Sequence, residues 1–236
     1  MKNIAILVFE SSDLDGVTKK WPKRSKELFD AMTSRALTQA RATQLPVYHY
    51  HNDLQRGDDF GQRISNSCQD LFDEGYDYVI AIGNDCPQIT TGLILEAEGH
   101  LTDGNDVIAP AIDGGFNLIG LHKERFNKNR FEQLPWQTEE LYTETVAYFS
   151  AFGHALSTLT TYSDIDSIAD IKRILPQIRC ALRSLYVMFL RVLHRAEHSY
   201  RYQHTYALAS YQERPFNKGS PPVSYTHLTL PTIYSV

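Results

Sequence analysis

Short apolar runs that alternate with helical segments constrain the fold of this chain most. Residues 3–9, NIAILVF, form a continuous apolar run of the kind found in strands buried on both faces of a sheet. Strands that alternate with helices are typical of an α/β domain with a mainly parallel sheet. The predicted strands are 3–9, 46–51, 78–82, 106–109 and 116–121, and the predicted helices are 25–42, a segment from about 60 to 75, and a short helix after residue 90.

The pattern changes beyond residue 121. We expect a helix over 138–152, an extended segment over 155–160, and a short helix over 165–175 that Pro176 breaks. From 177 to about 211, apolar residues recur every three or four positions, which predicts one long amphipathic helix. Its basic residues at multiples of four form a second face: Arg179, Arg183, Arg191 and Arg195.

Length and composition fit one ordinary soluble domain, alone or with an appendage. The chain has 236 residues, of which 42% are hydrophobic, and it holds an odd number of cysteines, 3, without a CxxC spacing. Neither a disulfide framework nor a structural zinc site is therefore expected. No apolar run approaches the roughly 18 residues of a membrane span, so we expect a cytoplasmic protein.

Charge is distributed unevenly along the chain. Residues 1–170 hold 14 Lys and Arg against 26 Asp and Glu, a balance of -12, whereas residues 171–236 hold 9 against 2, a balance of +7. An acidic body argues against nucleic-acid binding, which requires neutralised phosphates. The basic segment has two open interpretations, contact with an anionic membrane surface and pairing with the acidic body, and the second is favoured because those acids need no partner.

The first candidate site follows a predicted buried strand. Gly83 ends the strand, and Asn84 and Asp85 come directly after it. In open α/β sheets the ligand crevice lies beyond the carboxyl ends of the strands, and a carboxylate there is suited to Mg²⁺ or Mn²⁺ that bridges to a nucleotide diphosphate. The alternative is that Asp85 only caps a helix or holds the turn.

The second candidate site interrupts two predicted strands within 107–121, VIAPAIDGGFNLIGL. Paired glycines, Gly114 and Gly115, allow a ligand to approach the backbone closely, and Asp113 is a candidate base or second metal ligand. Asp-Gly is also an ordinary turn sequence, so a plain turn stays open.

These blocks together resemble a known family. IGNDCP at 82–87 and PAIDGGFNLIGL at 110–121, with GDDFGQRI at 57–64, FEQLPWQTEEL at 131–141 and YSDID at 162–166, resemble the bacterial glycosyltransferase-like family of nucleotide-diphospho-sugar transferases, the radical-SAM or selenodomain-associated group. The resemblance covers roughly residues 2–175. It implies a GT-A fold, a three-layer α/β sandwich with a mainly parallel sheet. A looser resemblance extends to molybdenum-cofactor and phospholactate guanylyltransferases.

The resemblance also implies roles for residues. Asp85 would bind a divalent metal, and Asp113, Gly114 and Gly115 would line the pocket, with Asp113 acting on the acceptor. The family carries a Gly-x-x-Lys-Thr-Arg loop after its first strand; here Lys19 matches the lysine, whereas the threonine and arginine are absent. The further substrate-binding candidates are Arg63, for which a surface salt bridge is the alternative, Asn84 and Asn117.

Two neighbouring features have structural interpretations. Cys86 lacks an identifiable base, so we interpret it as a packing residue rather than a nucleophile. Trp136 and Phe131 are expected to cover the sheet edge, and stacking on an acceptor is the alternative.

The sequence thus predicts a metal-dependent transferase with a nucleotide-diphospho-sugar donor and an undefined acceptor. The alternatives are a nucleotidyltransferase of the guanylyltransferase type and a non-enzymatic nucleotide-binding protein. We expect a transferase domain over 1–175, a basic helical extension over 176–222, and a tail over 223–236. The tail begins VSYTHLTLPT, which resembles a translated sequencing adapter; the alternative is a native tail.

Overall fold

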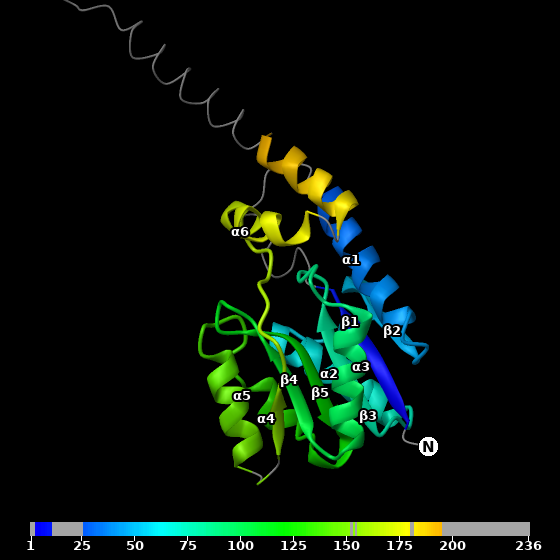
Figure 1. Cartoon of the computed structure of the whole chain (residues 1–236). Helices are drawn as coiled ribbons and strands as arrows, with labels where there is room; N and C mark the ends of the chain where they lie inside the picture. Colours follow the sequence, from blue (N-terminus) through cyan, green and yellow to red (C-terminus); the bar gives the residue numbers. More distant parts are fainter. Residues whose placement is uncertain (1–2, 11–25, 152, 154, 180–181, 195–236) are drawn as a thin grey trace, which may run out of the picture. The chain divides into compact units, whose positions relative to one another are not determined.

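A computed structural model describes residues 3–10, 26–151, 153, 155–179 and 182–194 (Figure 1). These residues contain a six-stranded sheet in the order β2-β1-β3-β5-β4-β6. β5 runs antiparallel to both neighbours, and the other pairs are parallel, which confirms the mainly parallel sheet. The strands are β1 (Ile4–Phe9), β2 (Val47–Tyr50), β3 (Tyr78–Gly83), β4 (Asp106–Pro110), β5 (Phe116–His122) and β6 (Leu156–Thr158).

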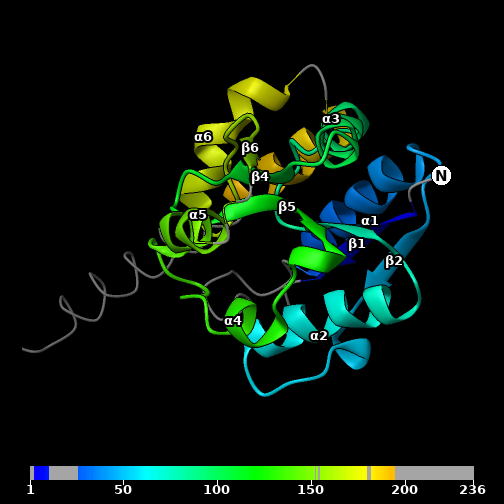
Figure 2. The same ribbon diagram turned by 90° about the horizontal axis from the view of Figure 1, so that it is seen from below.

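Helices cover both faces of the sheet. α1 and α3 pack on one face, and α2, α4 and α5 pack on the other, so this part of the chain forms three layers (Figure 2). The helices are α1 (Lys26–Arg41), α2 (Phe60–Asp73), α3 (Thr91–Thr102), α4 (Lys128–Glu132), α5 (Leu141–Ser150) and α6 (Ile168–Ile178), with 3-10 turns η3 (Asn52–Leu54) and η4 (Lys123–Arg125).

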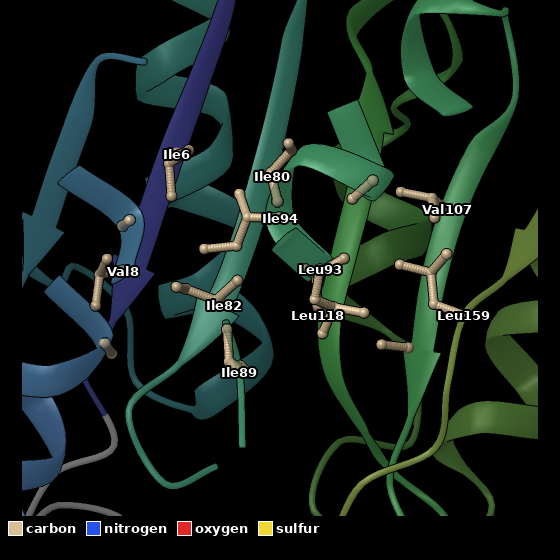
Figure 3. Close-up of a cluster of buried hydrophobic side chains, with 14 of the residues drawn as sticks. Ile6, Val8, Ile80, Ile82, Ile89, Leu93, Ile94, Val107, Leu118 and Leu159 are labelled. Carbon is tan, nitrogen blue, oxygen red and sulfur yellow. The ribbon is translucent and has the colours of Figure 1, made fainter. Parts of the chain in front are cut away.

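Alternate side chains of the strands build a core on each face. Ile6 of β1 and Ile80 of β3 lie beneath Ile94 of α3, all fully buried (Figure 3). Leu7 and Val79, their neighbours along the strands, point to the other face and pack with α2, α4 and α5. Strands buried on both faces explain the continuous apolar runs in the sequence.

Local signals set the ends of α2 and α3. Asp59 caps α2 through its side chain, which accepts a hydrogen bond of 2.8 Å from the Gln62 amide. Gly75 adopts a φ of 102° just after α2, and the Tyr76 amide donates to the Leu71 carbonyl, so the helix ends near residue 75, as predicted. Thr90 caps α3 in the same way as Asp59 caps α2.

The predicted break at Pro176 is wrong. α6 begins at Ile168 and continues through Pro176 to Ile178. Ile171, Ile174 and Ile178 are all buried, and their packing offsets the backbone hydrogen bond that proline removes.

The single helix predicted from 177 is also wrong at its start. α6 ends at Ile178, and the chain is helical again over 183–194. Leu185 and Phe189 of this second segment join α6 in a core cluster with Leu28 and Met32 of α1. Arg195 and the tail 223–236 lie outside the described residues. None of the described helices combines the length and hydrophobicity that crossing a membrane requires.

Candidate functional site

A cleft of about 560 Å³ opens at the edge of the sheet where β1, β3 and β4 end. Because β5 runs antiparallel, it begins at this edge, and Phe116 and Asn117 at its start line the cleft. The loops that follow β3, β4 and β6 therefore meet here, as expected for the ligand crevice of an open α/β sheet.

Four carboxylates line one part of the cleft, which we call the acidic half: Asp85, Asp113, Asp164 and Asp166. The Ile165 amide donates a hydrogen bond of 3.1 Å to the Asp85 carbonyl oxygen, which ties the segment after β6 to the loop after β3. Burial, together with the negative charges of Asp85 and Asp113, raises the pKa of Asp164 to about 9. Three separate segments of the chain thus bring acidic groups together.

The Asp113 turn carries both features expected for it. The Gly115 amide donates to Asp113 Oδ1 at 3.0 Å, so the aspartate holds its own turn. Asp113 and Gly115 also line the cleft. The turn interpretation and the site interpretation are therefore compatible.

Gly114 joins this turn to the loop before α5. It adopts a φ of 93°, and a Cβ there would lie 2.1 Å from the Glu139 carbonyl oxygen. The Tyr142 amide donates to the Gly114 carbonyl at 2.8 Å. Only glycine allows this approach, which brings Gln137, Thr138 and Glu139 to the rim of the cleft.

Four rings also line the cleft, and we call them the aromatic wall: Phe9, Phe60, Phe116 and Trp136. Neighbouring rings contact at centroid distances of 5.4 Å for Phe9–Phe60 and Phe60–Trp136, and 5.6 Å for Phe116–Trp136. Trp136 Nε1 donates to the Phe131 carbonyl at 3.0 Å, which fixes the indole ring. A Cβ on Gly61 would lie 2.5 Å from Trp136 Cδ1, so the glycine makes room for the ring.

Asn117 lies where the pairing of β4 and β5 is irregular. Ala109 pairs with Leu118, whereas Pro110 pairs with Phe116, so Asn117 is the extra residue of a β-bulge. The residue is 2% exposed, and its Nδ2 donates a long hydrogen bond of 3.4 Å to the Pro110 carbonyl. Its Oδ1 is buried and accepts no hydrogen bond from the described residues.

The other predicted site residues lie away from the lining of this cleft. Asn84 is buried, and its Nδ2 donates to Thr33 Oγ1 of α1 at 2.9 Å. Arg63 is also buried rather than at the surface, with its Nε donating to Gln55 Oε1 at 3.2 Å and its guanidinium 5.9 Å from the centre of the Phe60 ring. Lys19 lies outside the described residues.

The acidic half offers partial ligation for a divalent metal. Among the described residues, no set of three or more His, Cys, Asp and Glu side chains forms a ready metal cage. Carboxylate oxygens nevertheless suit Mg²⁺ and Mn²⁺, which take one or two carboxylates and complete their shell with water and phosphate oxygens. Asp164 Oδ1 is buried without a hydrogen-bond partner in the described structure, so its donor capacity is unused. The residues present fit such an ion.

Sequence reasoning assigned no role to Asp164, Asp166 or Glu139. Asp164 and Asp166 fall in the YSDID block, directly after a predicted extended segment, and a parallel β6 carries them to the same edge as Asp85. Their position directly after a predicted strand is the sequence signal that could have identified Asp164 and Asp166 as site residues. Glu139 reaches the cleft only through the Gly114 contact, which has no local sequence pattern.

Comparison with solved structures defines the fold class. The chain is similar to a provisionally named nucleotide-diphospho-sugar transferase from Desulfovibrio desulfuricans G20, with a TM-score of 0.70 and 23% identity over 81% of this chain and 95% of that one. It is also similar to 4-diphosphocytidyl-2C-methyl-D-erythritol synthase from Anaerococcus prevotii, with a TM-score of 0.51 and 9% identity over 75% and 99% of the two chains. The fold is therefore that of the nucleotide-diphospho-sugar transferases, as predicted.

A family profile matches part of the chain more directly. Residues 24–138 match the family described as "Uncharacterized protein conserved in bacteria (DUF2064)". The matched range contains both blocks on which the resemblance rests, around Asp85 and Asp113. This match and the transferase fold together confirm the resemblance stated from the sequence. The search of curated proteins gives no match.

Proposed function

We propose that this protein is a metal-dependent transferase that moves a sugar from a nucleotide-diphospho-sugar to an acceptor hydroxyl. The observation that carries the proposal is the acidic half, where four carboxylates from three segments meet at the strand ends. Like charges held together are costly, and a cation that binds them offsets that cost. The transferase fold supports the same proposal.

Asp85 and Asp164 are the residues proposed to hold Mg²⁺ or Mn²⁺. When bound, such an ion supplies positive charge that stabilises a departing diphosphate. Asp85 is half-buried beside the strand end, and Asp164 has one oxygen without a partner in the described structure. Lys19 and Arg63 are proposed to contact the phosphates of the donor.

Asp113 is proposed to act on the acceptor. Its Oδ1 accepts from the Gly115 amide, which holds the carboxylate at the exposed mouth of the cleft. A carboxylate in this position can accept a proton from an acceptor hydroxyl or orient it. Gly114 and Gly115 keep the backbone close to that point.

The basic extension is proposed to serve its own domain rather than a membrane. Leu185 and Phe189 are buried against α1 and α6, so one side of the helical segment 183–194 is occupied by the domain. This packing supports the interpretation favoured from the charge distribution. We propose a transferase domain over 1–175, a basic extension over 176–222 and a separate tail over 223–236.

Nucleotidyl transfer is the second candidate function. This chain shares its fold with a diphosphocytidyl-methylerythritol synthase, and the name of that protein describes a nucleotidyl product. The shared fold therefore supports nucleotidyl transfer as an alternative. The two reactions differ in the group released. A glycosyltransferase releases a nucleoside diphosphate from its donor, whereas a nucleotidyltransferase releases pyrophosphate from a nucleoside triphosphate.

Product analysis separates these functions. The protein is incubated with Mn²⁺ and either nucleotide-diphospho-sugars or nucleoside triphosphates plus sugar phosphates, and products are separated by anion exchange. We expect release of a nucleoside diphosphate, stimulated by an acceptor. Release of pyrophosphate alone would establish the second candidate, and no turnover together with ligand-induced stabilisation would favour a binding protein.

A further inference from the structure

Besides the acidic half and the aromatic wall, the lining of the cleft includes a buried amide with an unused acceptor. Asn117 lines the cleft, is 2% exposed, and its Oδ1 accepts no hydrogen bond from the described residues. A buried acceptor without a donor costs about 1–3 kcal/mol. A ligand group that donates a hydrogen bond from within the cleft would remove this cost.

The β-bulge explains why this amide lies at the cleft. In a regular ladder, side chains alternate between the two faces of the sheet. The extra residue at 117 breaks that alternation, so that Phe116 and Asn117, which are adjacent, both line the cleft. Bulges of this kind re-aim side chains beside active sites.

The aromatic wall supplies an apolar surface next to the amide. Phe60, Phe116 and Trp136 are each partly exposed. The indole N–H of Trp136 already donates its hydrogen bond to the Phe131 carbonyl, so the ring presents an apolar surface to the cleft. Gly61 allows this placement, since any side chain there would meet Trp136.

The polar groups named so far in the cleft are mostly acceptors. The four carboxylates of the acidic half, Glu139 and Asn117 Oδ1 can all receive hydrogen bonds. They suit a ligand that is rich in donors and has an apolar ring face. A sugar ring has this combination, because its hydroxyl groups donate at the edge and its C–H groups lie on the face. A nucleobase edge carries acceptors as well as donors, and those acceptors would face carboxylates.

We propose that Asn117 and the aromatic wall form a sugar-ring subsite, in which the apolar ring face lies on Trp136 and Phe116 and a hydroxyl donates to Asn117 Oδ1. The proposal rests on the proposed function and deepens it, since it names the chemistry that the cleft selects. The ring can come from the donor or from the acceptor, which share this chemistry.

Tryptophan fluorescence reports on this subsite directly. The chain has 2 tryptophans, so Trp21→Phe leaves Trp136 as the single indole. In this background the probes are methyl glycosides of glucose, galactose, mannose and N-acetylglucosamine, with choline as a cationic probe of the rings. We expect at least one glycoside to change Trp136 emission saturably, and Asn117→Ala to weaken its binding at least about tenfold.

Ser65→Ala is the matched control for Asn117→Ala. Ser65 is also fully buried with an Oγ that has no partner in the described structure, but it does not line the cleft. We expect glycoside binding to be unchanged in this variant. Equal weakening in both variants would show a general effect on folding and would overturn the subsite.

Titrations with nucleotides show whether the bound sugar belongs to the donor or to the acceptor. They also separate failure of the subsite from failure of the proposed function. Binding of a glycoside with a nucleoside diphosphate and Mn²⁺ also bound indicates the acceptor. A nucleotide-diphospho-sugar that binds more tightly than its nucleoside diphosphate, with the difference lost in Asn117→Ala, indicates the donor. Nucleoside diphosphate binding without any Asn117-dependent sugar binding would overturn the subsite and leave the proposed function standing. A response to choline but not to any sugar would overturn it as well.

Discussion

The Ile165 amide donates to the Asp85 carbonyl oxygen at 3.1 Å, and this hydrogen bond joins two loops that are 80 residues apart in sequence. It places Asp164 beside Asp85 at the strand ends. The pair has an electrostatic consequence, because burial and the charge of Asp85 raise the pKa of Asp164 to about 9. Both residues therefore influence stability even before any ligand binds.

Metal-free protein should lose stability as pH rises because of Asp164. Its pKa is 3.8 when unperturbed and about 9 in the folded protein, so the folded state holds the proton more tightly. The associated stability is fully present below about pH 4 and is lost as pH rises toward 9. Asp164→Asn should therefore raise the melting temperature relative to the parent more at about pH 8 than at about pH 5, measured with EDTA present.

Asp58→Asn is the control for this pH series. Asp58 is an exposed carboxylate in the loop before α2, so its removal should leave the pH profile parallel to that of the parent. A stability gain for Asp164→Asn that is the same at both pH values would contradict a raised pKa.

Gly61→Ala should destabilise the protein by about 1–3 kcal/mol. The added Cβ would lie 2.3 Å from the Glu132 carbonyl oxygen and 2.5 Å from Trp136 Cδ1, so α2 and the Trp136 loop would have to separate. Gly99→Ala is the matched helical control, because a Cβ there meets nothing within 4 Å and α3 should gain about 0.5–1 kcal/mol. Urea unfolding measures both, and a neutral Gly61→Ala would show that Trp136 is not tightly packed.

Cys68 and Cys86 should resist thiol reagents in the folded protein. Both are free and buried, and burial raises the pKa of each thiol, so the reactive thiolate is scarce near pH 8. In a Cys180→Ser background, we expect reaction with Ellman's reagent only after denaturant is added. Rapid labelling of a native thiol, mapped to Cys86 by mass spectrometry, would contradict the packing role of Cys86 and support a role as a nucleophile.

The sequence predicted the parts of the fold that follow from local pattern. The apolar runs of β1 and β3 identify strands because both faces of the sheet are covered, and Gly75 marks the end of α2 because only a positive φ suits that turn. The short connection from Pro110 to Phe116 indicates that β5 runs antiparallel to β4, because parallel strands need a long crossover. The place of β5 between β3 and β4 has no local signature. The five-residue α4 is too short for a periodic pattern, and α6 passes Pro176 because tertiary packing outweighs the local penalty.

The candidate site likewise contains residues that local sequence pattern predicts and residues that only tertiary packing places. Asp85 and Asp113 could be found because they interrupt buried strands, and the structure brings both to one cleft. Asn84 lies at the same strand end but is directed to Thr33, a contact with α1 that no spacing predicts. Glu139 and the placement of Asn117 depend on a close glycine contact and a β-bulge, which arise only when distant segments pack.

Calorimetric titration with a nucleoside diphosphate and Mn²⁺ tests the central claim most directly. The parent protein should bind the pair together, and Asp85→Asn should weaken this binding at least about tenfold, because it loses the carboxylate that meets the cation. Asp103→Asn, at the exposed end of α3 before β4, is the control and should bind like the parent. Binding by Asp85→Asn that equals the parent's, or binding by the parent that does not depend on Mn²⁺, would contradict the proposed metal-dependent transferase.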